Sequence, residues 1–279
     1  MIPQTFDYTA PKTLDEALKL LGAGAKALAG GMSLIPMMKL RLAAPERLVD
    51  LGRIKDLNYI KESGGNLHIG ATATHYAVES SELVRSKCPL FAATAAAIGD
   101  VQVRNMGTVG GSVAHADPSA DYPAALQALE AKIVIAGAKG ARTVSAAEFF
   151  VDAFTTLLEE GEIVREVILP VDDSGSSYQK APQPASGFAM VGIAVRVKKA
   201  GGKIAQARIG VTGLSNSSFR ATAAEKALEG TSGTAADIQK AAALVAQGID
   251  ANSDIHASAD YRKHLATVYA ARGLTAALS

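Results

Sequence analysis

The first pattern along the chain is an apolar face with helical spacing. Thr13 and Glu16 form a capping-box signature, in which a hydroxyl and a carboxylate accept the first free N–H groups of a helix. The apolar face that follows consists of Leu14, Ala17, Leu18 and Leu21, and Gly22 is placed to end the helix. Apolar runs at residues 25–29 and 48–51 predict two short strands. Residues 1–57 are therefore expected to form a small α/β unit.

A second α/β unit is predicted over residues 58–175. Its expected strands are residues 67–71, 132–136 and 163–170, and its expected helices are residues 76–87, 91–98 and 118–129, with Pro118 in the first turn. Residues 107–116 are rich in glycine and are expected to form a loop. The Pro-, Ser- and Gly-rich stretch at residues 171–187 is expected to be a loop or a domain boundary.

The third predicted unit covers residues 176–279. Two strand candidates, residues 188–197 and 203–212, are joined by the turn sequence Ala200-Gly201-Gly202. Three helix candidates follow, at residues 221–228, 234–246 and 258–278. Strands followed by helices indicate an α+β domain.

Composition excludes several classes of protein. The chain has 279 residues and a net charge of +1 with scattered Lys and Arg, which argues against nucleic-acid binding. No apolar run approaches the roughly 20 residues that span a bilayer, and the N-terminus does not resemble a secretory signal, so a cytoplasmic location is expected. The single cysteine, Cys88, cannot hold an iron–sulfur cluster, and the five histidines show no metal-ligand spacing. Any redox metal is therefore expected in another chain.

Two Gly-Gly segments are the best candidates for chemistry. One is Gly30-Gly31, directly after a predicted strand, and the other is Gly110-Gly111, ten residues before Asp121. Glycine lets backbone N–H groups approach an anion closely. Additional donors and acceptors near the two segments are Ser33, Thr108, Ser112, Asp117 and Asp121. Either segment alone is more often a simple turn, and the GxGxxG dinucleotide fingerprint is missing, so the residues by themselves indicate only a candidate anion-binding protein.

Three stretches of the chain together resemble a known family. They are AGGMSLIPMMKLR (residues 29–41), VRNMGTVGGSVAHADPSADYPAAL (residues 103–126) and DIHASADYRKHLATVYAARGL (residues 254–274). They resemble the medium, FAD-binding subunit of the molybdenum hydroxylases, the group of carbon monoxide dehydrogenase and the xanthine dehydrogenase flavin domain. The resemblance implies an α+β chain with a vanillyl-alcohol-oxidase-type FAD-binding fold, in which two α/β subdomains hold the flavin and a C-terminal α+β domain follows.

The resemblance also implies a set of cofactor-binding residues. Both Gly-Gly segments would wrap the FAD pyrophosphate, Asp121 would contact the sugar or ribityl part, Ile98 would lie against the cofactor, and Val164 and Lys180 would lie near the isoalloxazine. The implied residues are Ala29, Gly30, Gly31, Met32, Ser33, Leu34, Ile98, Thr108, Val109, Gly110, Gly111, Ser112, Asp121, Val164 and Lys180. The chain departs from the family at Met32, where His is common, and at Gly187, where many relatives have Asp.

The function implied by the resemblance is electron relay without a catalytic acid, base or nucleophile in this chain. Electrons from a large molybdopterin subunit would pass through [2Fe–2S] clusters of a small subunit to this FAD and then to an external acceptor. The expected assembly is a dimer of heterotrimers. Two alternatives stay open: a self-sufficient FAD-dependent oxidase or dehydrogenase, and a non-catalytic scaffold subunit.

Overall fold

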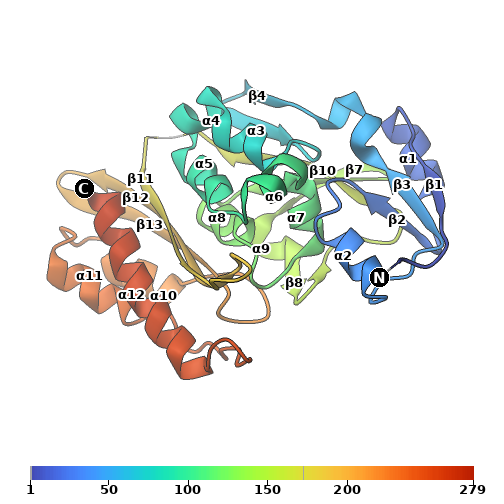
Figure 1. Ribbon diagram of the computed structural model, residues 1–279. Helices are drawn as coiled ribbons and strands as arrows, with labels where there is room; N and C mark the ends of the chain where they lie inside the picture. Colours follow the sequence, from blue (N-terminus) through green and yellow to red (C-terminus); the bar gives the residue numbers. More distant parts are fainter. Residues whose placement is uncertain (1, 172) are drawn as a thin grey trace.

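The computed structural model describes residues 2–171 and 173–279, and its N-terminal part is a small parallel sheet (Figure 1). This sheet has the order β1-β3-β2, with both neighbouring pairs parallel. Its elements are β1 (Asp7–Thr9), α1 (Leu14–Leu20), β2 (Ala25–Leu28), α2 (Leu34–Lys39) and β3 (Arg47–Asp50), followed by short 3-10 turns at Leu51–Arg53 and Lys55–Leu57. The Thr13 hydroxyl caps α1 as predicted, and the Glu16 carboxylate accepts the N–H of Lys12.

A five-stranded antiparallel sheet forms the middle of the molecule, in the order β4-β5-β10-β6-β7. Its strands are β4 (Ile60–Ser63), β5 (Asn66–Gly70), β6 (Lys132–Gly137), β7 (Gly140–Ser145) and β10 (Ile163–Pro170), and a small hairpin of β8 (Phe150–Asp152) and β9 (Thr155–Thr156) lies apart from them. The helices of this part are α3 (His75–Ser80), α4 (Glu82–Lys87), α5 (Pro89–Ala96), α6 (Val101–Met106), α7 (Val109–His115), α8 (Tyr122–Ala128) and α9 (Ala146–Phe149).

The C-terminal part is a four-stranded antiparallel sheet with three helices packed against it (Figure 1). Its strands are β11 (Gly175–Pro182), β12 (Ala189–Ala200), β13 (Lys203–Thr212) and β14 (Phe219–Arg220), and its helices are α10 (Thr222–Leu228), α11 (Ala235–Ala242) and α12 (Ala259–Leu278). The predicted turn between β12 and β13 is present, and its residues Gly201 and Gly202 have φ of 58° and 75°, the left-handed values that a two-residue hairpin turn requires. The predicted α+β class is therefore confirmed.

Several local predictions were wrong for identifiable reasons. The helix expected over residues 76–87 is interrupted at Ser81, whose extended backbone and side-chain hydroxyl start a second helix, α4. The Gly-rich residues 107–116 form helix α7, because Thr108 caps it and the apolar Val109 and Val113 bury one face. The helix expected from Pro118 begins only at Tyr122, with a different proline in its first turn.

The stretch at residues 171–187 is also more ordered than its composition suggested. Strand β11 runs through Gly175–Pro182 and pairs with β12 along its whole length. Successive side chains of β11 point alternately toward the two halves of the molecule. Composition alone does not reveal this arrangement. The part of the expected loop at position 172 lies outside the described residues. The boundaries at residues 57/58 and 175/176 stay predictions.

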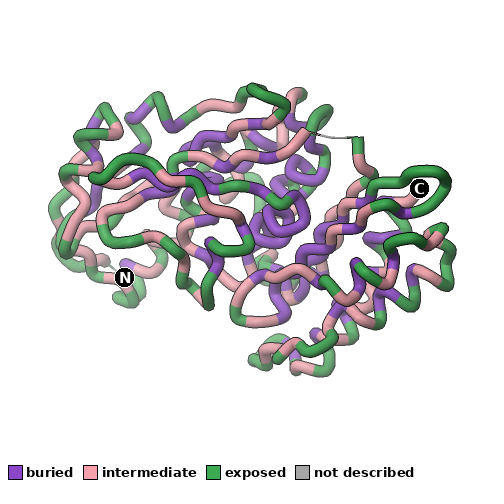
Figure 2. The backbone as a smooth tube through the Cα atoms, turned by 180° about the vertical axis from the view of Figure 1, so that it is seen from behind, coloured by how far each residue is buried: buried purple, intermediate pink, exposed green. Residues whose placement is uncertain are grey.

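The core of the middle part lies against the C-terminal sheet rather than apart from it. Buried residues are concentrated in the central helices and in the inner strands of the C-terminal sheet (Figure 2). Helix α8 packs directly on β13, where a Cβ added to Gly210 would lie 1.9 Å from the carbonyl oxygen of Ala124. Tyr122 at the start of α8 is fully buried and stacks on Phe91, with ring centroids 4.6 Å apart. The two halves therefore share a close, helix-to-strand interface.

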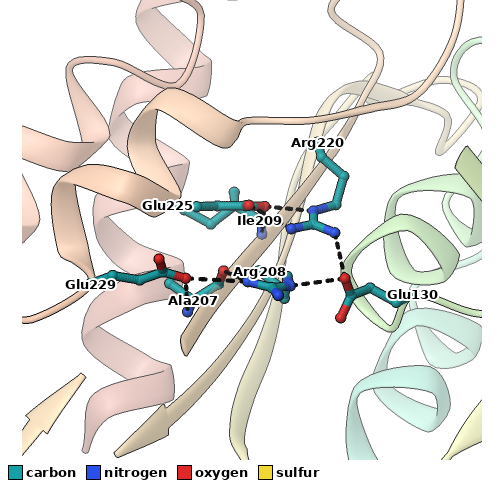
Figure 3. A network of polar contacts seen from close by, with 7 residues as sticks. All are labelled: Glu130, Ala207, Arg208, Ile209, Arg220, Glu225 and Glu229. Carbon is teal, nitrogen blue, oxygen red and sulfur yellow. Dashed lines mark hydrogen bonds and ion pairs between the residues drawn. The ribbon is translucent and has the colours of Figure 1, made fainter. Parts of the chain in front are cut away.

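A network of ion pairs closes the far end of this interface (Figure 3). Glu130, directly after α8, pairs with both Arg208 at 3.1 Å and Arg220 at 3.0 Å. The buried carboxylate of Glu225 accepts two hydrogen bonds from Arg220 and one from the backbone N–H of Ile209. Because Glu130 comes from the middle part and the other four come from the C-terminal part, the network holds the two parts in register.

Candidate cofactor-binding site

A cavity of about 720 Å³ lies where the N-terminal, middle and C-terminal parts meet. Its walls include most of the residues singled out from the sequence: Ala29, Gly30, Gly31, Met32, Ser33, Leu34, Ile98, Thr108, Gly110, Gly111, Ser112, Asp121 and Val164. The C-terminal part contributes Ser186, Gly187 and Phe188. The structure thus brings together residues that are more than a hundred positions apart in the sequence.

The first Gly-Gly segment, residues 29–34, has an unusual set of free donors. Within the described chain, none of the backbone N–H groups of these residues donates a hydrogen bond to a protein acceptor. The segment lies between the end of β2 and the start of α2, and all six residues border the cavity. Unpaired N–H groups are costly unless water or a ligand accepts their hydrogen bonds. A row of such groups on a cavity wall fits a multiply charged anion such as a pyrophosphate.

Close backbone packing explains why glycine is needed in this segment. A Cβ on Gly30 would lie 2.0 Å from the carbonyl oxygen of Met106 and 2.8 Å from Cα of Gly107. Gly31 has φ of 73°, a left-handed conformation that other L-residues adopt only with strain. The first segment therefore crosses the chain just before the second Gly-Gly segment at backbone contact distance.

The second Gly-Gly segment is built differently, because its first N–H groups already have acceptors. The N–H groups of Val109 and Gly110 donate to the carbonyl oxygens of Ala73 and Ala71, at 3.0 and 2.8 Å. The Gly111 N–H donates to the Thr108 hydroxyl at 3.2 Å. The N–H groups at the start of the second segment are therefore already paired within the protein.

The positions of the individual residues in this second segment also differ from one another. Val109 is fully buried and is absent from the cavity wall. A Cβ on Gly110 would lie 2.4 Å from Cβ of Ala71, so Gly110 is required for helix-to-strand packing. Gly111 and Ser112 border the cavity, and outside the backbone of helix α7 the described atoms nearest to a Cβ on Gly111 would be Thr108 Oγ1 at 2.8 Å and Ala29 Cβ at 4.0 Å. The second segment therefore supplies a close-fitting wall at Gly111 and Ser112.

Asp121 and Lys180 form a buried ion pair at the edge of the cavity. Lys180 Nζ donates to Asp121 Oδ2 at 2.8 Å and to the carbonyl oxygen of Ala97 at 2.8 Å. The Tyr178 hydroxyl donates to Asp121 Oδ1 at 2.5 Å. Asp121 borders the cavity, whereas Lys180 reaches the site through Asp121 and Ala97. Both side chains on β11 point toward the middle part, so the C-terminal part fixes the position of the carboxylate.

Burial and hydrogen bonds act in opposite directions on the Asp121 carboxyl. Burial is the larger effect and raises its pKa to about 6, while the Lys180 ammonium and the two hydrogen bonds lower the pKa. Burial and the nearby Asp121 charge raise the pKa of the Tyr178 hydroxyl well above its ordinary value, so Tyr178 stays protonated and remains a donor. The site therefore holds a carboxylate whose charge depends on its two β11 partners.

The remaining predicted residues form an apolar part of the wall. Ile98 is half-buried and Val164 is buried, and both border the cavity. The departures at Met32 and Gly187 also lie on the wall, where Met32 is 39% exposed and Gly187 has φ of 72°. A glycine at 187 is thus suited to its left-handed backbone conformation.

Sequence reasoning missed several wall residues, including Thr72, His75, Gly107 and Phe188. No other histidine lies near His75 at a spacing typical of a metal site. Only the fold shows that His75 lies at the cavity, with 4% of its surface exposed. Among residues 2–171 and 173–279, His, Cys, Asp and Glu side chains form no group of three that could hold a metal ion. None of the helices in the same two ranges is long and apolar enough to cross a bilayer.

Two family models match the chain in succession. Residues 4–172 match the FAD binding domain in molybdopterin dehydrogenase, and residues 176–277 match the CO dehydrogenase flavoprotein C-terminal domain. The chain therefore belongs to the family of FAD-binding medium subunits of molybdenum hydroxylases.

Individual relatives agree with this assignment over full length. The carbon monoxide dehydrogenase medium chain of Hydrogenophaga pseudoflava is 40% identical, with 99% of this chain and 98% of the relative covered. The glyceraldehyde dehydrogenase medium chain of Sulfolobus acidocaldarius is 37% identical, with 96% of each covered. A solved structure of the Hydrogenophaga pseudoflava carbon monoxide dehydrogenase superposes with a TM-score of 0.96 at 42% identity, covering 99% of this chain and 98% of the other. The function predicted from the sequence, a flavoprotein component of a molybdenum-dependent oxidoreductase, is thereby confirmed.

Proposed function

We propose that this chain binds FAD in the cavity between its three parts, with the pyrophosphate on residues 29–34. The observation that carries the proposal is the row of backbone N–H groups there that have no acceptor within the described chain. A pyrophosphate can accept several of these hydrogen bonds at once, and a charged acceptor makes each of them stronger than a neutral one. The Ser33 hydroxyl, on the same stretch of wall, adds one more donor.

The rest of the wall fits the other parts of FAD. Gly111 and Ser112 form the cavity wall along helix α7, and Ser112 brings a hydroxyl group. Asp121 accepts hydrogen bonds from sugar or ribityl hydroxyls, while its pairing with Lys180 fixes its position. Ile98 and Val164 offer apolar surface to the aromatic parts of the cofactor. Lys180 acts through Asp121 in this arrangement.

The proposed role of the chain is electron transfer between partner subunits and an external acceptor. Bound FAD supplies the chemistry, because a flavin exchanges electrons singly or in pairs. The residues of this chain bind the cofactor, orient it and limit its contact with water. The proposed partners are a large molybdopterin subunit and a small subunit with [2Fe–2S] clusters, assembled as a dimer of heterotrimers. The medium-chain names of the relatives support partners of this kind.

One experiment separates this role from its two alternatives. The chain is purified alone and with its co-expressed partners, its visible spectrum is recorded, and the released cofactor is identified by chromatography. We expect FAD in the chain, with substrate-dependent reduction of that FAD only in the complex. Substrate oxidation by the isolated chain would favour a self-sufficient oxidase or dehydrogenase, and a complex without flavin would favour a scaffold. Mass measurement of the complex by light scattering tests the dimer of heterotrimers.

A further inference from the structure

His75 is a buried polar residue of the cavity wall to which neither the sequence motifs nor the family resemblance assigned a role. It is the first residue of α3, and its backbone N–H donates to the carbonyl oxygen of Gly107 at 3.0 Å. Its surface is only 4% exposed, and the exposed part borders the cavity. A histidine so deeply buried needs partners for both ring nitrogens.

One ring nitrogen has a partner that determines the tautomer. His75 Nδ1 lies 3.3 Å from the hydroxyl oxygen of Tyr122, and no other described residue is hydrogen-bonded to that hydroxyl. Tyr122 is fully buried, and burial raises the pKa of its hydroxyl well above the ordinary value. The hydroxyl therefore stays protonated, and its only acceptor is Nδ1. In a neutral imidazole, a Nδ1 that accepts leaves the proton on Nε2.

The ring is neutral over the physiological range. Burial is the larger cause and the nearby Arg104 guanidinium the smaller, and together they lower the pKa of His75 to about 4. Nε2–H is thus a single uncharged donor, and within the described residues it has no hydrogen-bond acceptor. Because Nε2 is not fully enclosed by protein and His75 borders the cavity, a ligand in the cavity can supply the acceptor for this donor.

The position of Nε2 indicates which part of a ligand it meets. A Cβ on Gly107 would lie 2.6 Å from His75 Nε2, so the ring nitrogen lies against that glycine. Gly107 is also packed against Gly30, whose Cβ would lie 2.8 Å from Cα of Gly107. Only one glycine therefore separates Nε2 from the segment of free backbone N–H groups at residues 29–34.

We infer that His75 is a cofactor-binding residue whose Nε2–H donates to an oxygen of the FAD pyrophosphate, and that Tyr122 is a positioning residue that fixes the tautomer. This inference rests on the proposed function, because it requires the pyrophosphate to lie on residues 29–34. It adds a side-chain donor from α3 to the backbone donors of the first segment. It also gives the His75–Tyr122 pair a role beyond core packing.

The test compares three substitutions that separate the two ring nitrogens. Gln places an amide nitrogen near the position of Nε2, Asn places one near Nδ1, and Phe keeps the ring without a donor. The dissociation constant of FAD is measured for the cofactor-free full chain and for His75→Gln, His75→Asn and His75→Phe. We expect about 10-fold weaker binding or more for Phe and Asn, from the loss of one hydrogen bond to a charged group, and binding within about 3-fold of the parent for Gln.

The fragment ADP, which carries the pyrophosphate without the flavin, locates the acceptor. We expect the substitutions to weaken ADP binding by the same factors by which they weaken FAD binding. An ADP affinity that stays unchanged in His75→Phe while FAD affinity falls would overturn the pyrophosphate assignment. Equal FAD affinities in the parent and His75→Phe, or equal losses for Gln and Asn, would overturn the inference altogether.

Two further measurements keep the test independent of folding defects. Nitrogen-15 NMR of histidine in the parent chain should show the Nε2–H tautomer, with its Nε2 signal shifted by ADP, and Tyr122→Phe should give a mixture of tautomers. A parent chain with the Nδ1–H tautomer contradicts the inference. If the parent chain binds neither FAD nor ADP, the proposed function itself fails; if the parent binds both and His75→Phe matches it, only the inference fails.

Discussion

The buried pair of Asp121 and Lys180 allows a quantitative prediction for Lys180→Met. Methionine keeps much of the length of lysine but removes the charge and the hydrogen bonds to Asp121 and Ala97. Since the Lys180 charge and hydrogen bond both lower the pKa of the Asp121 carboxyl, the variant should have an Asp121 pKa above the value of about 6 in the parent. Stability should then depend on pH differently in the two proteins.

The magnitude follows from the difference between folded and unfolded pKa values of Asp121. The parent value of about 6 lies roughly two units above the ordinary 3.8, which corresponds to a loss of ~3 kcal/mol of folding free energy once the pH is above the folded pKa. In the variant, the largest possible loss at pH 7.5 is that of holding the carboxyl protonated, ~5 kcal/mol. At pH 5 the carboxyl is mostly protonated in both folded proteins, so this contribution nearly cancels.

The sign of the effect follows from the raised pKa. A carboxyl with a raised folded pKa gives its full contribution to stability below its unfolded pKa, and that contribution is lost as the pH rises through the folded value. Lys180→Met should therefore be destabilised more at pH 7.5 than at pH 5, by up to ~2 kcal/mol, relative to the parent at each pH. Urea unfolding of the cofactor-free chain at the two pH values measures the difference.

A matched control removes the titrating group. In the background of Asp121→Asn, the cost of Lys180→Met should be the same at both pH values, because no carboxyl is left to take up a proton. If Lys180→Met lowers the unfolding free energy of the parent by the same amount at both pH values, the reasoning is refuted, because Lys180 would then not stabilise the charged form of Asp121.

Two further predictions concern stability. Gly110→Ala should destabilise the cofactor-free chain by ~1–3 kcal/mol in urea unfolding, since its Cβ would lie 2.4 Å from Cβ of Ala71; a neutral effect would contradict the helix-to-strand contact. Glu225→Ala should cost ~3–5 kcal/mol, because it leaves Arg220 with a broken buried pair, whereas Glu130→Ala, at a 45% exposed side chain, should cost ~1 kcal/mol or less. Equal costs for the two glutamates would show that burial does not set the strength of this network.

Local sequence patterns predicted the elements whose signals are local. Strand β13 (Lys203–Thr212) and strand β10 (Ile163–Pro170) have the predicted bounds, because an apolar alternation or run between turn residues marks both ends. The hairpin turn at Gly201 and Gly202 was likewise predicted from two adjacent glycines. These features depend on a few neighbouring residues and on no distant contact.

The misassigned elements depend on tertiary contacts that no local pattern carries. The glycines of residues 107–116 suggested a loop, but Gly110 lies in helix α7, where the missing side chain allows contact with Ala71. Two adjacent glycines thus lie in a loop at residues 30–31 and inside a helix at residues 110–111, and their composition does not distinguish the two cases. Strand β11 was missed because its edge of the sheet is stabilised by pairing with β12 and by buried bonds such as Lys180 to Asp121.

The candidate site was predicted in part. The family resemblance predicted most of the residues that form the cavity wall. Only the fold shows that the backbone N–H groups of residues 29–34 have no protein acceptor, whereas those at the start of α7 do. His75 was missed, because a lone histidine in a sequence is more often a core residue than a ligand-binding one. The cytoplasmic location, the external acceptor and the dimer of heterotrimers stay predictions.

The most direct test of the central claim is the FAD affinity of Gly31→Val beside that of Gly65→Val. Both glycines have φ of 73°, so valine causes similar backbone strain at either position. A Cβ on Gly31 would in addition lie 2.6 Å from Cδ1 of Ile35, so Gly31→Val also displaces that side chain, whereas a Cβ on Gly65 would meet no described atom within 4 Å beyond its chain neighbours. Only Gly31 belongs to the segment of free N–H groups. We predict at least a 10-fold loss of FAD affinity for Gly31→Val and an unchanged affinity for Gly65→Val. Equal affinities in both variants and the parent would contradict the claim that residues 29–34 hold the pyrophosphate.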